Sequence, residues 1–580
     1  MSIFSYRDFD EKSLMKDAVL MLKYINEVFA GVDSGYQQEA ESAGWKVLNG
    51  EDIGFAGNSG AHDEFYGEVL ALLTSQVNIM GKYDDAGNMT GLGIYFWGTG
   101  AAVDDEFSWL HMISDGLADI GIALGNSGAS NDYIIIAFDK LLTRVAEFAQ
   151  ENGLTGHDVL ISGHSMGGMG VNSMASASSL GAWGGFYEDS AYIATASPTQ
   201  NQLDDKVLNL GLENDPVYRV LEGDSITGST LGVHDKPLET CANNLVAFND
   251  YYTSAYGSTL LNIEDWMNGH GMDWYITAFN TILKSDFYES TDLNSTIIVA
   301  QLSDAMRETT WVEDLDRVAL PHEGPTFILG SEKADLIAGG KGIDYLEGFG
   351  GNDVFRDAGG FNVISGGKGY DTFDLNGELS KTSIAQNDDG TIFIKGADGG
   401  VSVLYGVEAI KETYWNWFEY KDLTYSVTSN GLALDGKHAL DYADAVHGDQ
   451  SGTSEIFAPE QGGFYQNDTS WLFSYDDTIM HGSSGSDVFV SGSGNDIMYA
   501  NGGDDTFMFA GDSFGDNVIY QFDQDDKLVI LGNKEINANG NYLDYLSECD
   551  DGLLFTCGDS SISLVGLTLD QVHESQFVLA

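Results

Sequence analysis

Beyond residue 329 the sequence repeats every nine residues. Five units follow one another without a gap: GSEKADLIA from Gly330, GGKGIDYLE from Gly339, GFGGNDVFR from Gly348, DAGGFNVIS from Asp357 and GGKGYDTFD from Gly366. Three approximate units, GSSGSDVFV, SGSGNDIMY and ANGGDDTFM, follow from Gly482. Their common pattern is G-G-x-G-x-D-x-U-x, where U is apolar. Because a flexible glycine-rich linker does not hold an Asp and an apolar residue at a fixed spacing, the pattern predicts a parallel β-roll.

The chemistry of each unit predicts several bound calcium ions. Glycines allow the tight turn, the sixth-position carboxylate and nearby carbonyls are the hard oxygen ligands that Ca²⁺ prefers, and the eighth residue packs inward. Asn362 is the one substitution at the sixth position of the first block. The predicted ligand positions are Asp335, Gly339, Gly340, Gly342, Asp344, Gly348, Gly350, Asp353, Gly366, Gly367, Gly369, Asp371, Asp487, Asp496 and Asp505. Between the two blocks, TIFIKG and VSVLYG predict strands.

The overall charge agrees with a need for bound cations. Lys and Arg total 25 and Asp and Glu total 90, which gives a net charge of −65. Such self-repulsion weakens any compact state without counterions, and it disfavours a nucleic-acid partner. Residues 1–22 lack a secretory signal, and no stretch reaches bilayer-spanning length. We therefore expect neither cleaved-signal export nor a membrane anchor.

The first half of the chain has a different pattern. Five of the six prolines lie at or before Pro325, and we predict two domains, residues 1–325 and 326–580. In the first, apolar runs at 93–96, 159–161 and 207–210 alternate with helical stretches such as 133–150. This alternation predicts an α/β fold with a mostly parallel sheet flanked by helices.

A nucleophile motif lies in this α/β half. The sequence DVLISGHSMGG at 158–168 is a buried strand, a sharp glycine turn and the start of a small-residue helix. Gly163, Ser165 and Gly167 form G-x-S-x-G in the strand-turn-helix context of an α/β-hydrolase. We predict that Ser165 is the nucleophile, the alternative being a purely structural turn.

A nucleophilic serine needs an acid and a histidine, which follow it in this order in α/β-hydrolases. Asp215 lies in a loop after the strand at 207–210, with Asp224 and Asp235 as rivals. For the base, His270 lies in a loop between glycines, whereas His234 and His322 are alternatives. Position along the chain leaves both choices open.

The oxyanion that forms during ester cleavage needs two hydrogen-bond donors. The backbone N–H of Met166, directly after the nucleophile, is the first. The second is assigned to Thr99, which lies in GIYFWGTG, a strand that ends in a glycine turn. A simple strand-ending turn is the alternative.

With these motifs in place, the whole chain resembles the true-lipase family that Serratia and Pseudomonas secrete through type I exporters, which includes polyurethane-degrading esterases. The resemblance rests on GHSMGG, WGGFY, ASPTQ, ENDPVYR, GVHDKP, TWVEDL and GPTFI, and on the ends MSIFSYRDFDE and FVLA. Carried over residue by residue, it implies the triad Ser165, Asp215 and His270. The family's F-R-G-T motif appears here as FWGT, with Trp97 in place of Arg.

The resemblance also implies a calcium site beside the catalytic loop and a mobile lid. The calcium site would be built from Glu213, Asp235, Asn243 and Asn244. The lid corresponds to 103–125, where an apolar stripe includes Leu110, Ile113 and Leu117; a fixed core helix is the alternative. One family aspartate that binds calcium in the lid is replaced by His111, a poor ligand for a hard cation.

These features predict an extracellular, calcium-dependent serine ester hydrolase of the triacylglycerol lipase type that works as a monomer. Phospholipase A1 and polyester or polyurethane esterase are alternatives on the same triad. A calcium-binding adhesin or surface-layer protein is the non-enzyme alternative. The expected partners are a lipid or other ester substrate at an interface and a type I secretion exporter, for which ISLVG and the final FVLA resemble an uncleaved signal.

Overall fold

The chain is seen here as a computed structural model, and its residues form two compact units. The structure describes all residues except 1, 32, 58, 69–74, 99–128, 198–205, 216–240, 253–268, 317–321, 323, 444, 460–468 and 537–540. The N-terminal unit comprises 2–284 and 316–322, and the C-terminal unit comprises 285–315 and 323–580. The chain thus enters its second unit at residue 285, earlier than the expected boundary after residue 325.

A twisted sheet forms the centre of the N-terminal unit. Its strand order is β1-β3-β4-β5-β6-β7-β8, with β2 beside β3. The pairs β1–β3 and β3–β4 are antiparallel, and the strands from β4 to β8 run parallel as expected. The bounds are β1 Trp45–Leu48, β2 Phe65–Tyr66, β3 Gln76–Tyr83, β4 Met89–Phe96, β5 Val159–His164, β6 Ala191–Thr195, β7 Leu208–Leu212 and β8 Cys241–Phe248.

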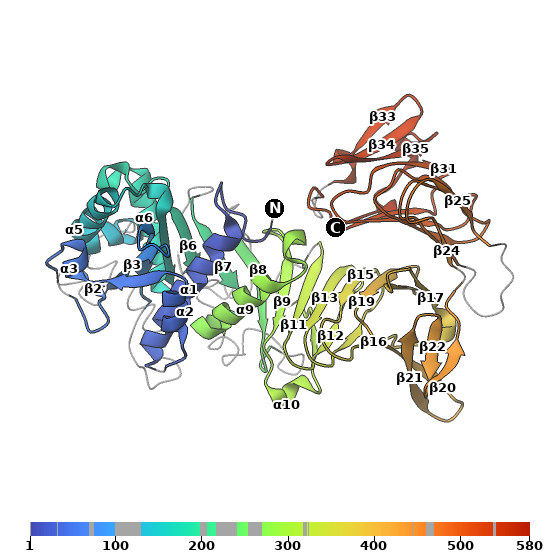
Figure 1. The fold of residues 1–580 in the computed structure, drawn as a ribbon, viewed down its shortest axis with the longest axis horizontal. Helices are drawn as coiled ribbons and strands as arrows, with labels where there is room; N and C mark the ends of the chain where they lie inside the picture. The colour runs from blue at the N-terminus through green and yellow to red at the C-terminus, as the bar shows by residue number, and fades with distance from the viewer. Residues whose placement is uncertain are drawn as a thin grey trace. The chain divides into compact units, whose positions relative to one another are not determined.

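Helices cover both faces of this sheet (Figure 1). On β4, Leu92, Ile94 and Phe96 share a buried core with residues of α5 and α6, whereas the position of Gly93 meets Met21 of α1. Because alternate residues of a strand point to opposite faces, α1 lies across the sheet from α5 and α6. The helices are α1 Glu11–Ala30, α2 Tyr36–Ser42, α3 Gly50–Ile53, α5 Ala129–Glu151, α6 Met166–Ser179 and α9 Met272–Lys284. Among the described helices, none has the length and apolar character to cross a membrane.

The C-terminal unit begins with a first β-roll of two facing sheets. Within the repeat units, strands pair in parallel at a spacing of 18 residues, as Asp344 does with Asn362, so two nine-residue units make one full turn. One sheet contains β9 Thr296–Ala300, β11 Thr326–Ser331, β13 Ile343–Phe349, β15 Phe361–Ser365 and β19 Val401–Tyr405. The other contains β10 Trp311–Glu313, β12 Leu336–Ala338, β14 Val354–Arg356, β16 Thr372–Asp374 and β20 Ala409–Trp415. Since β9 and β10 pair with β11 and β12, residues before the first repeat already form one turn of the roll.

Antiparallel strands complete this first roll. One sheet ends with β18 Ile392–Lys395 and β17 Ser383–Gln386, so TIFIKG and VSVLYG form the predicted strands. The other ends with β21 Tyr420–Thr428, β22 Gly431–Leu434 and β23 Lys437–Leu440. The short helix α10 Asp304–Arg307 lies between β9 and β10.

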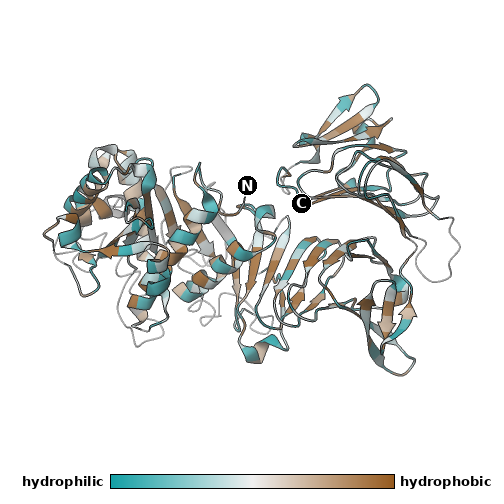
Figure 2. Ribbon diagram, viewed as in Figure 1, coloured by the Kyte–Doolittle hydropathy of each residue, from teal (hydrophilic) through white to brown (hydrophobic). Residues whose placement is uncertain are grey.

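A second roll contains the second repeat block. Its first sheet holds β24 Ala445–His447, β26 Ser470–Phe473, β28 Asp487–Ser491, β30 Thr506–Ala510, β32 Lys527–Leu531 and β36 Phe577–Leu579. Its second sheet holds β25 Ser454–Phe457, β27 Thr478–His481, β29 Ile497–Tyr499, β31 Asp516–Tyr520, β35 Ser560–Val565, β34 Gly552–Cys557 and β33 Leu546–Cys549. Eighth-position residues pack inside, and the rings of Phe489 and Phe507 stack with centroids 4.6 Å apart. Hydrophobic residues recur along the strands of both rolls (Figure 2).

Candidate active site and calcium turns

Ser165 occupies a strained turn between β5 and α6. Its backbone angles are φ 58° and ψ −124°, and the strand ends one residue before it while the helix begins one residue after it. Positive φ is unfavourable for a residue with a Cβ atom, so the surrounding structure must hold this conformation. Strain of this kind is typical of a nucleophile presented above a sheet.

The two glycines of G-x-S-x-G make this turn possible. A Cβ atom on Gly167 would lie 2.0 Å from the main-chain oxygen of Phe96, and one on Gly163 would lie 2.5 Å from the carbonyl of Gly167. Both distances are far below van der Waals contact. Only glycine at these positions allows β4, β5 and α6 to approach each other so closely.

Three polar side chains form a continuous hydrogen-bonded chain at this turn. His270 Nε2 lies 3.0 Å from Ser165 Oγ, and His270 Nδ1 lies 3.0 and 3.1 Å from the two carboxylate oxygens of Asp215. Asp215 follows β7 and is fully buried, whereas His270 lies just before α9 and is partly accessible. The structure thus brings together the three residues that the resemblance implies, which lie 55 and 105 residues apart in the chain.

Tyr275 of α9 fixes the acid of this chain. Its hydroxyl donates a 2.6 Å hydrogen bond to Asp215 Oδ2 and accepts one of 3.0 Å from the N–H of Leu212. The Tyr275 side chain is fully buried. A buried carboxylate is tolerated only when it is paired or hydrogen-bonded, so Tyr275 helps to stabilise and orient Asp215.

His164 holds the backbone of His270. Its Nε2 lies 2.9 Å from the carbonyl oxygen of His270, and its Nδ1 lies 3.1 Å from Thr195 Oγ1. Since a carbonyl can only accept, the proton must be on Nε2, and the Thr195 hydroxyl donates to Nδ1. Burial, followed by the nearby His270, lowers the pKa of His164 to about 3. His164 is therefore a neutral support and not a second base.

The predicted oxyanion donors are described only in part. The N–H of Met166 is at the first position of α6, where backbone donors have no partner within the helix. A Cβ atom on Gly98, just after β4, would lie 3.4 Å from Ser165 Cβ, so Gly98 lies next to Ser165. Trp97 is anchored by a 2.6 Å hydrogen bond from its Nε1 to Asn78 Oδ1 on β3. Thr99 itself lies outside the described residues.

The calcium site implied beside the catalytic loop is described only in part. Glu213 is fully buried; its Oε1 accepts a 2.8 Å hydrogen bond from Tyr252, and its Oε2 lies 3.0 Å from His322 Nε2. His322, one of the alternative bases, thus faces Glu213 and not Ser165. Asn244 lies on β8. Asp235, the side chain of Asn243 and the lid residues Leu110, Ile113 and Leu117 lie outside what the structure describes.

The repeat aspartates form a ladder along one edge of each roll. The N–H of Asp335 donates to Asp353 Oδ1, and the N–H of Asp353 donates to Asp371 Oδ1, each at 2.8 Å. In the second roll, the N–H of Asp487 donates to Asp505 Oδ1 at 2.8 Å. Asp353, Asp371 and Asp505 therefore each have one carboxylate oxygen held by the preceding turn.

The surroundings of the second carboxylate oxygen, Oδ2, distinguish the turns that fit a cation from the other turns. Oδ2 of Asp353, Asp371 and Asp505 is buried without a hydrogen-bond partner. Burial raises the pKa of Asp353 and Asp505 to about 8, because an ionised carboxylate without a partner is unfavourable there. A hard cation at these oxygens would satisfy them, so these residues fit calcium.

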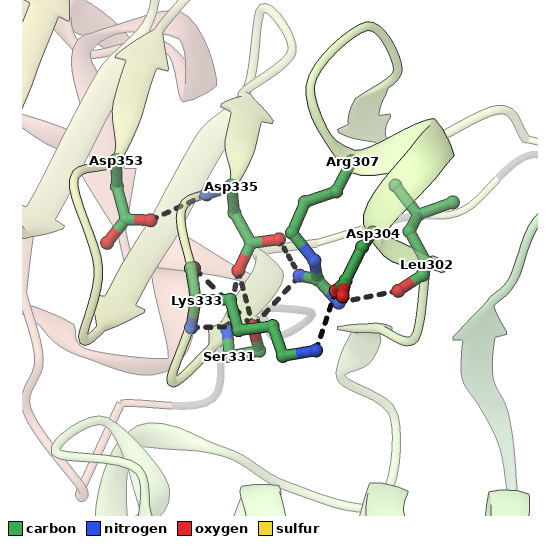
Figure 3. A network of polar contacts seen from close by, with 7 residues as sticks. All are labelled: Leu302, Asp304, Arg307, Ser331, Lys333, Asp335 and Asp353. Carbon is green, nitrogen blue, oxygen red and sulfur yellow. Dashed lines mark hydrogen bonds and ion pairs between the residues drawn. The ribbon is translucent and has the colours of Figure 1, made fainter.

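Other predicted ligands already have protein partners. Asp344 Oδ2 accepts from the N–H of Gly340 at 2.8 Å, and Asp487 accepts from the backbone and hydroxyl of Ser483. Asp496 accepts from two serine hydroxyls at 2.6 and 2.7 Å. Asp335 contacts Arg307 and Ser331 (Figure 3).

Known proteins resemble the chain in both its repeats and its whole length. Residues 329–356 and 475–513 match the RTX calcium-binding nonapeptide repeat, in four copies. Two lipases of Pseudomonas fluorescens are 46% and 43% identical over 51% and 48% of this chain. These matches span 62% of the length of each curated relative. The crystal structure of the extracellular lipase LipA from Serratia marcescens matches with a TM-score of 0.85 and 38% identity, covering 100% of both chains. The chain belongs to the family of type I-secreted RTX lipases.

Three supports of the site in this RTX lipase were not found from sequence. Tyr275 and Thr195 lie in segments whose pattern predicts ordinary core helix and strand, so nothing marks their hydroxyls as partners of the triad. Arg307 lies before the repeats begin. A signal did exist for Arg307, because the first repeat, GSEKADLIA, has Ser331 and Lys333 where the pattern has glycine.

Proposed function

We propose that the chain is an extracellular, calcium-dependent carboxylic-ester hydrolase with an α/β-hydrolase N-terminal unit, and that it cleaves lipid esters of the triacylglycerol type. The hydrogen-bonded chain from Ser165 through His270 to Asp215 carries this proposal. The strained turn at Ser165 and the family relationship support it further.

The geometry supports an acyl-enzyme mechanism. His270 Nε2 takes the proton of the Ser165 hydroxyl while Oγ attacks the ester carbonyl, and Asp215 stabilises the resulting imidazolium. The Met166 N–H and a donor from the segment after Gly98 stabilise the oxyanion. His270 then gives its proton to the leaving alcohol. Water attacks the acyl-enzyme by the same route, which releases the fatty acid and restores Ser165.

Calcium has a structural part in this proposal. Bound calcium would neutralise the stacked carboxylates of the rolls at Asp353, Asp371 and Asp505, whose inner oxygens have no partner. At the low calcium level inside a cell, the repeats would stay less folded, which suits passage through a type I exporter. Glu213 with Asp235, Asn243 and Asn244 is proposed to hold a further ion beside the catalytic loop.

One comparison of variants tests the catalytic proposal. Ser165→Ala, Asp215→Ala and His270→Ala in the full chain should each lower hydrolysis of a dissolved short ester at least about 10³-fold. Ser179→Ala, the same change near the end of α6, should keep activity. Equal activity of Ser165→Ala and Ser179→Ala would contradict the proposal and favour an adhesin or surface-layer protein.

The substrate class is tested separately. Triolein, phosphatidylcholine and an aliphatic polyester should be compared at equal ester concentration with saturating calcium. We expect the highest rate on triolein. A phosphatidylcholine or polyester rate that exceeds it would assign the same triad to a phospholipase A1 or polyester esterase.

A further inference from the structure

Arg307 lies at the position where the repeat pattern predicts the first calcium ion. Its Nη1 contacts Asp335 Oδ1 and donates a 2.8 Å hydrogen bond to Ser331 Oγ. Its Nη2 donates a 2.6 Å hydrogen bond to the carbonyl of Leu302. Both Arg307 and Asp335 are buried, with 8% and 1% of their surfaces exposed.

Asp335 differs from the next two aspartates of its ladder. Its Oδ2 accepts from the N–H and the hydroxyl of Ser331, at 2.8 and 2.9 Å. Both of its oxygens therefore have protein partners, whereas Asp353 and Asp371 each keep a buried oxygen without one. Figure 3 shows Arg307 beside the Asp335 carboxylate, whereas the Asp353 carboxylate accepts from the N–H of Asp335.

The sequence of the first repeat agrees with this arrangement. Ser331 and Lys333 replace two glycines of the pattern, and Ser331 supplies the hydroxyl that Arg307 and Asp335 share. Lys333 Nζ pairs with Asp304 at 2.6 Å, which links this turn to α10. The turn before Asp335 is not a repeat, and among the described residues no preceding backbone N–H donates to its Oδ1, so Arg307 takes that place.

We propose that the Asp335 turn does not bind calcium, and that Arg307 is a permanent cation that caps the ladder there. The calcium sites of the first roll then begin at Asp353. The Arg307 cap offers a preformed first turn on which the calcium-dependent turns can stack.

Calcium stoichiometry in the full chain tests this assignment. At saturating calcium, equilibrium dialysis with metal analysis should show that Asp353→Asn loses at least one bound ion while Asp335→Asn loses none. Equal losses in the two matched variants would overturn the proposal. Should either variant fail to fold, a crystal of the unchanged chain with a lanthanide decides, since an ion within about 2.6 Å of an Asp335 oxygen would overturn it.

A double-variant cycle tests the capping role. Arg307→Gln leaves the Asp335 charge without its partner, so the calcium concentration at half-folding of the roll should rise at least about fivefold. Adding Asp335→Asn removes that charge and should recover most of the shift. The capping role would be contradicted if Arg307→Gln left the calcium concentration at half-folding unchanged. It would also be contradicted if the double variant did not recover the shift.

A separate feature of the first roll is an aromatic hairpin tip formed by residues 414–420, between β20 and β21. Trp417 and Phe418 are 87% and 89% exposed, and Trp415 and Tyr420 are 50% and 72% exposed. Trp415 and Tyr420 form a cross-strand pair with ring centroids 5.0 Å apart. Four exposed aromatic rings on one hairpin are costly unless they contact a partner.

The tip is also held in a fixed shape. Trp417 has a φ of 78°, and the Asn416 side chain accepts hydrogen bonds from the N–H groups of Phe418 and Glu419, at 3.1 and 3.0 Å. The rings therefore project with little loss of conformational freedom on binding. Residues 414–418, YWNWF, carry no charge, and Glu419 of the tip pairs with Lys421 at 2.7 Å, whereas the whole chain has a charge of −65.

We infer that this aromatic tip binds an electrically neutral lipid surface, an inference that rests on the proposed lipid-ester function. Trp and Tyr rings suit the boundary between lipid and water because one part of each ring is apolar and another forms hydrogen bonds. The negative charge of the chain opposes anionic membranes, which makes a zwitterionic or uncharged surface the fitting partner.

Vesicle binding by the full chain tests this inference. With calcium and in a Ser165→Ala background, cosedimentation with phosphatidylcholine vesicles should weaken at least about tenfold in Trp417→Asn/Phe418→Ser. Leu180→Ser, which removes a hydrophobic side chain that is 89% exposed on the other unit, should bind as its parent does. Equal binding of the tip variant and its parent would overturn the inference, as would tip-dependent self-association without vesicle binding.

The same variants separate this inference from the proposed function. With Ser165 restored, the tip variant should keep its rate on a dissolved short ester. Vesicle binding that depends on the tip in a chain without ester hydrolysis would contradict the proposed function alone.

Discussion

Removing calcium should make the stability of the rolls depend on pH through the buried aspartates. Asp353 is fully buried and its pKa is raised from 3.8 to about 8, because burial disfavours its charged form. Its folded-state pKa lies above the unfolded value. The stability it contributes is therefore fully present below about pH 3.8 and is progressively lost as pH rises toward 8.

The size of this effect follows from the pKa shift. One pKa unit corresponds to about 1.4 kcal/mol, so raising the pH from 3.8 to 7 costs the metal-free roll about 4 kcal/mol at Asp353. Asp505, with a pKa of about 8, imposes a similar cost on the second roll. Each cost is a large fraction of the stability of an ordinary domain.

Asp353→Asn in the full chain should therefore act in opposite directions with and without calcium. With chelator at pH 7, it removes a buried carboxyl group that must take up a proton on folding, and it should stabilise the roll by about 2 to 4 kcal/mol. With saturating calcium, it removes a ligand and should destabilise the roll. Denaturant unfolding followed by circular dichroism at pH 5 and 7, with calcium or chelator, measures both effects.

Two outcomes would refute this reasoning. One is that the metal-free roll is no more stable at pH 5 than at pH 7, and the other is that Asp353→Asn destabilises it in chelator. The N-terminal unit provides an internal contrast, since burial lowers the pKa of His164 from 6.5 to about 3. The stability that His164 contributes is present above pH 6.5 and is lost as pH falls toward 3. This pH dependence is opposite in sign to that of the rolls.

Other predictions concern the supports of the triad. Tyr275→Phe removes a hydrogen bond to the buried Asp215 carboxylate and should lower the free energy of unfolding by about 2 kcal/mol, measured with urea; an unchanged value would contradict this role. Gly167→Ala places a methyl group against a main-chain oxygen of β4 and should cost about 3 kcal/mol and most of the activity, and a fully active variant would show that the turn can relax. His164→Phe keeps a ring but frees the carbonyl of His270, so kcat on a dissolved ester should fall about tenfold with little change in KM, whereas a change in KM alone would indicate a role in substrate binding.

The repeats allowed much of the C-terminal unit to be predicted from sequence. A nine-residue period with an inward apolar position specifies a two-sheet roll in which each repeat strand pairs with the one 18 residues later, as found from β11 to β16. The first turn, β9 and β10, was not predicted, because parallel pairing depends on backbone hydrogen bonds that leave no glycine or aspartate signature. The departures from the pattern at Ser331 and Lys333 indicated an unusual first repeat, but only the structure shows that Arg307 contacts its Asp335 carboxylate.

The catalytic site was predictable in part. The glycines around Ser165 mark the turn because only they fit there, so the prediction of Ser165 as the nucleophile follows from local sequence. Asp215 and His270 are brought to it by β7 and α9 from distant parts of the chain, and residue order alone did not separate them from Asp224, Asp235, His234 and His322. The family resemblance resolved that choice, while the hydroxyl of Tyr275 had no signature in the sequence.

Covalent labelling of the serine tests the central claim most directly. The full chain with calcium should be treated with an alkyl phosphonate ester that reacts with activated serines, and the modified residue should be located by mass spectrometry. One phosphonyl group per chain is expected, on Ser165, and His270→Ala should lose the labelling while Ser179→Ala keeps it. Labelling of another serine, or labelling of Ser165 that persists in His270→Ala, would contradict the triad on which the account depends.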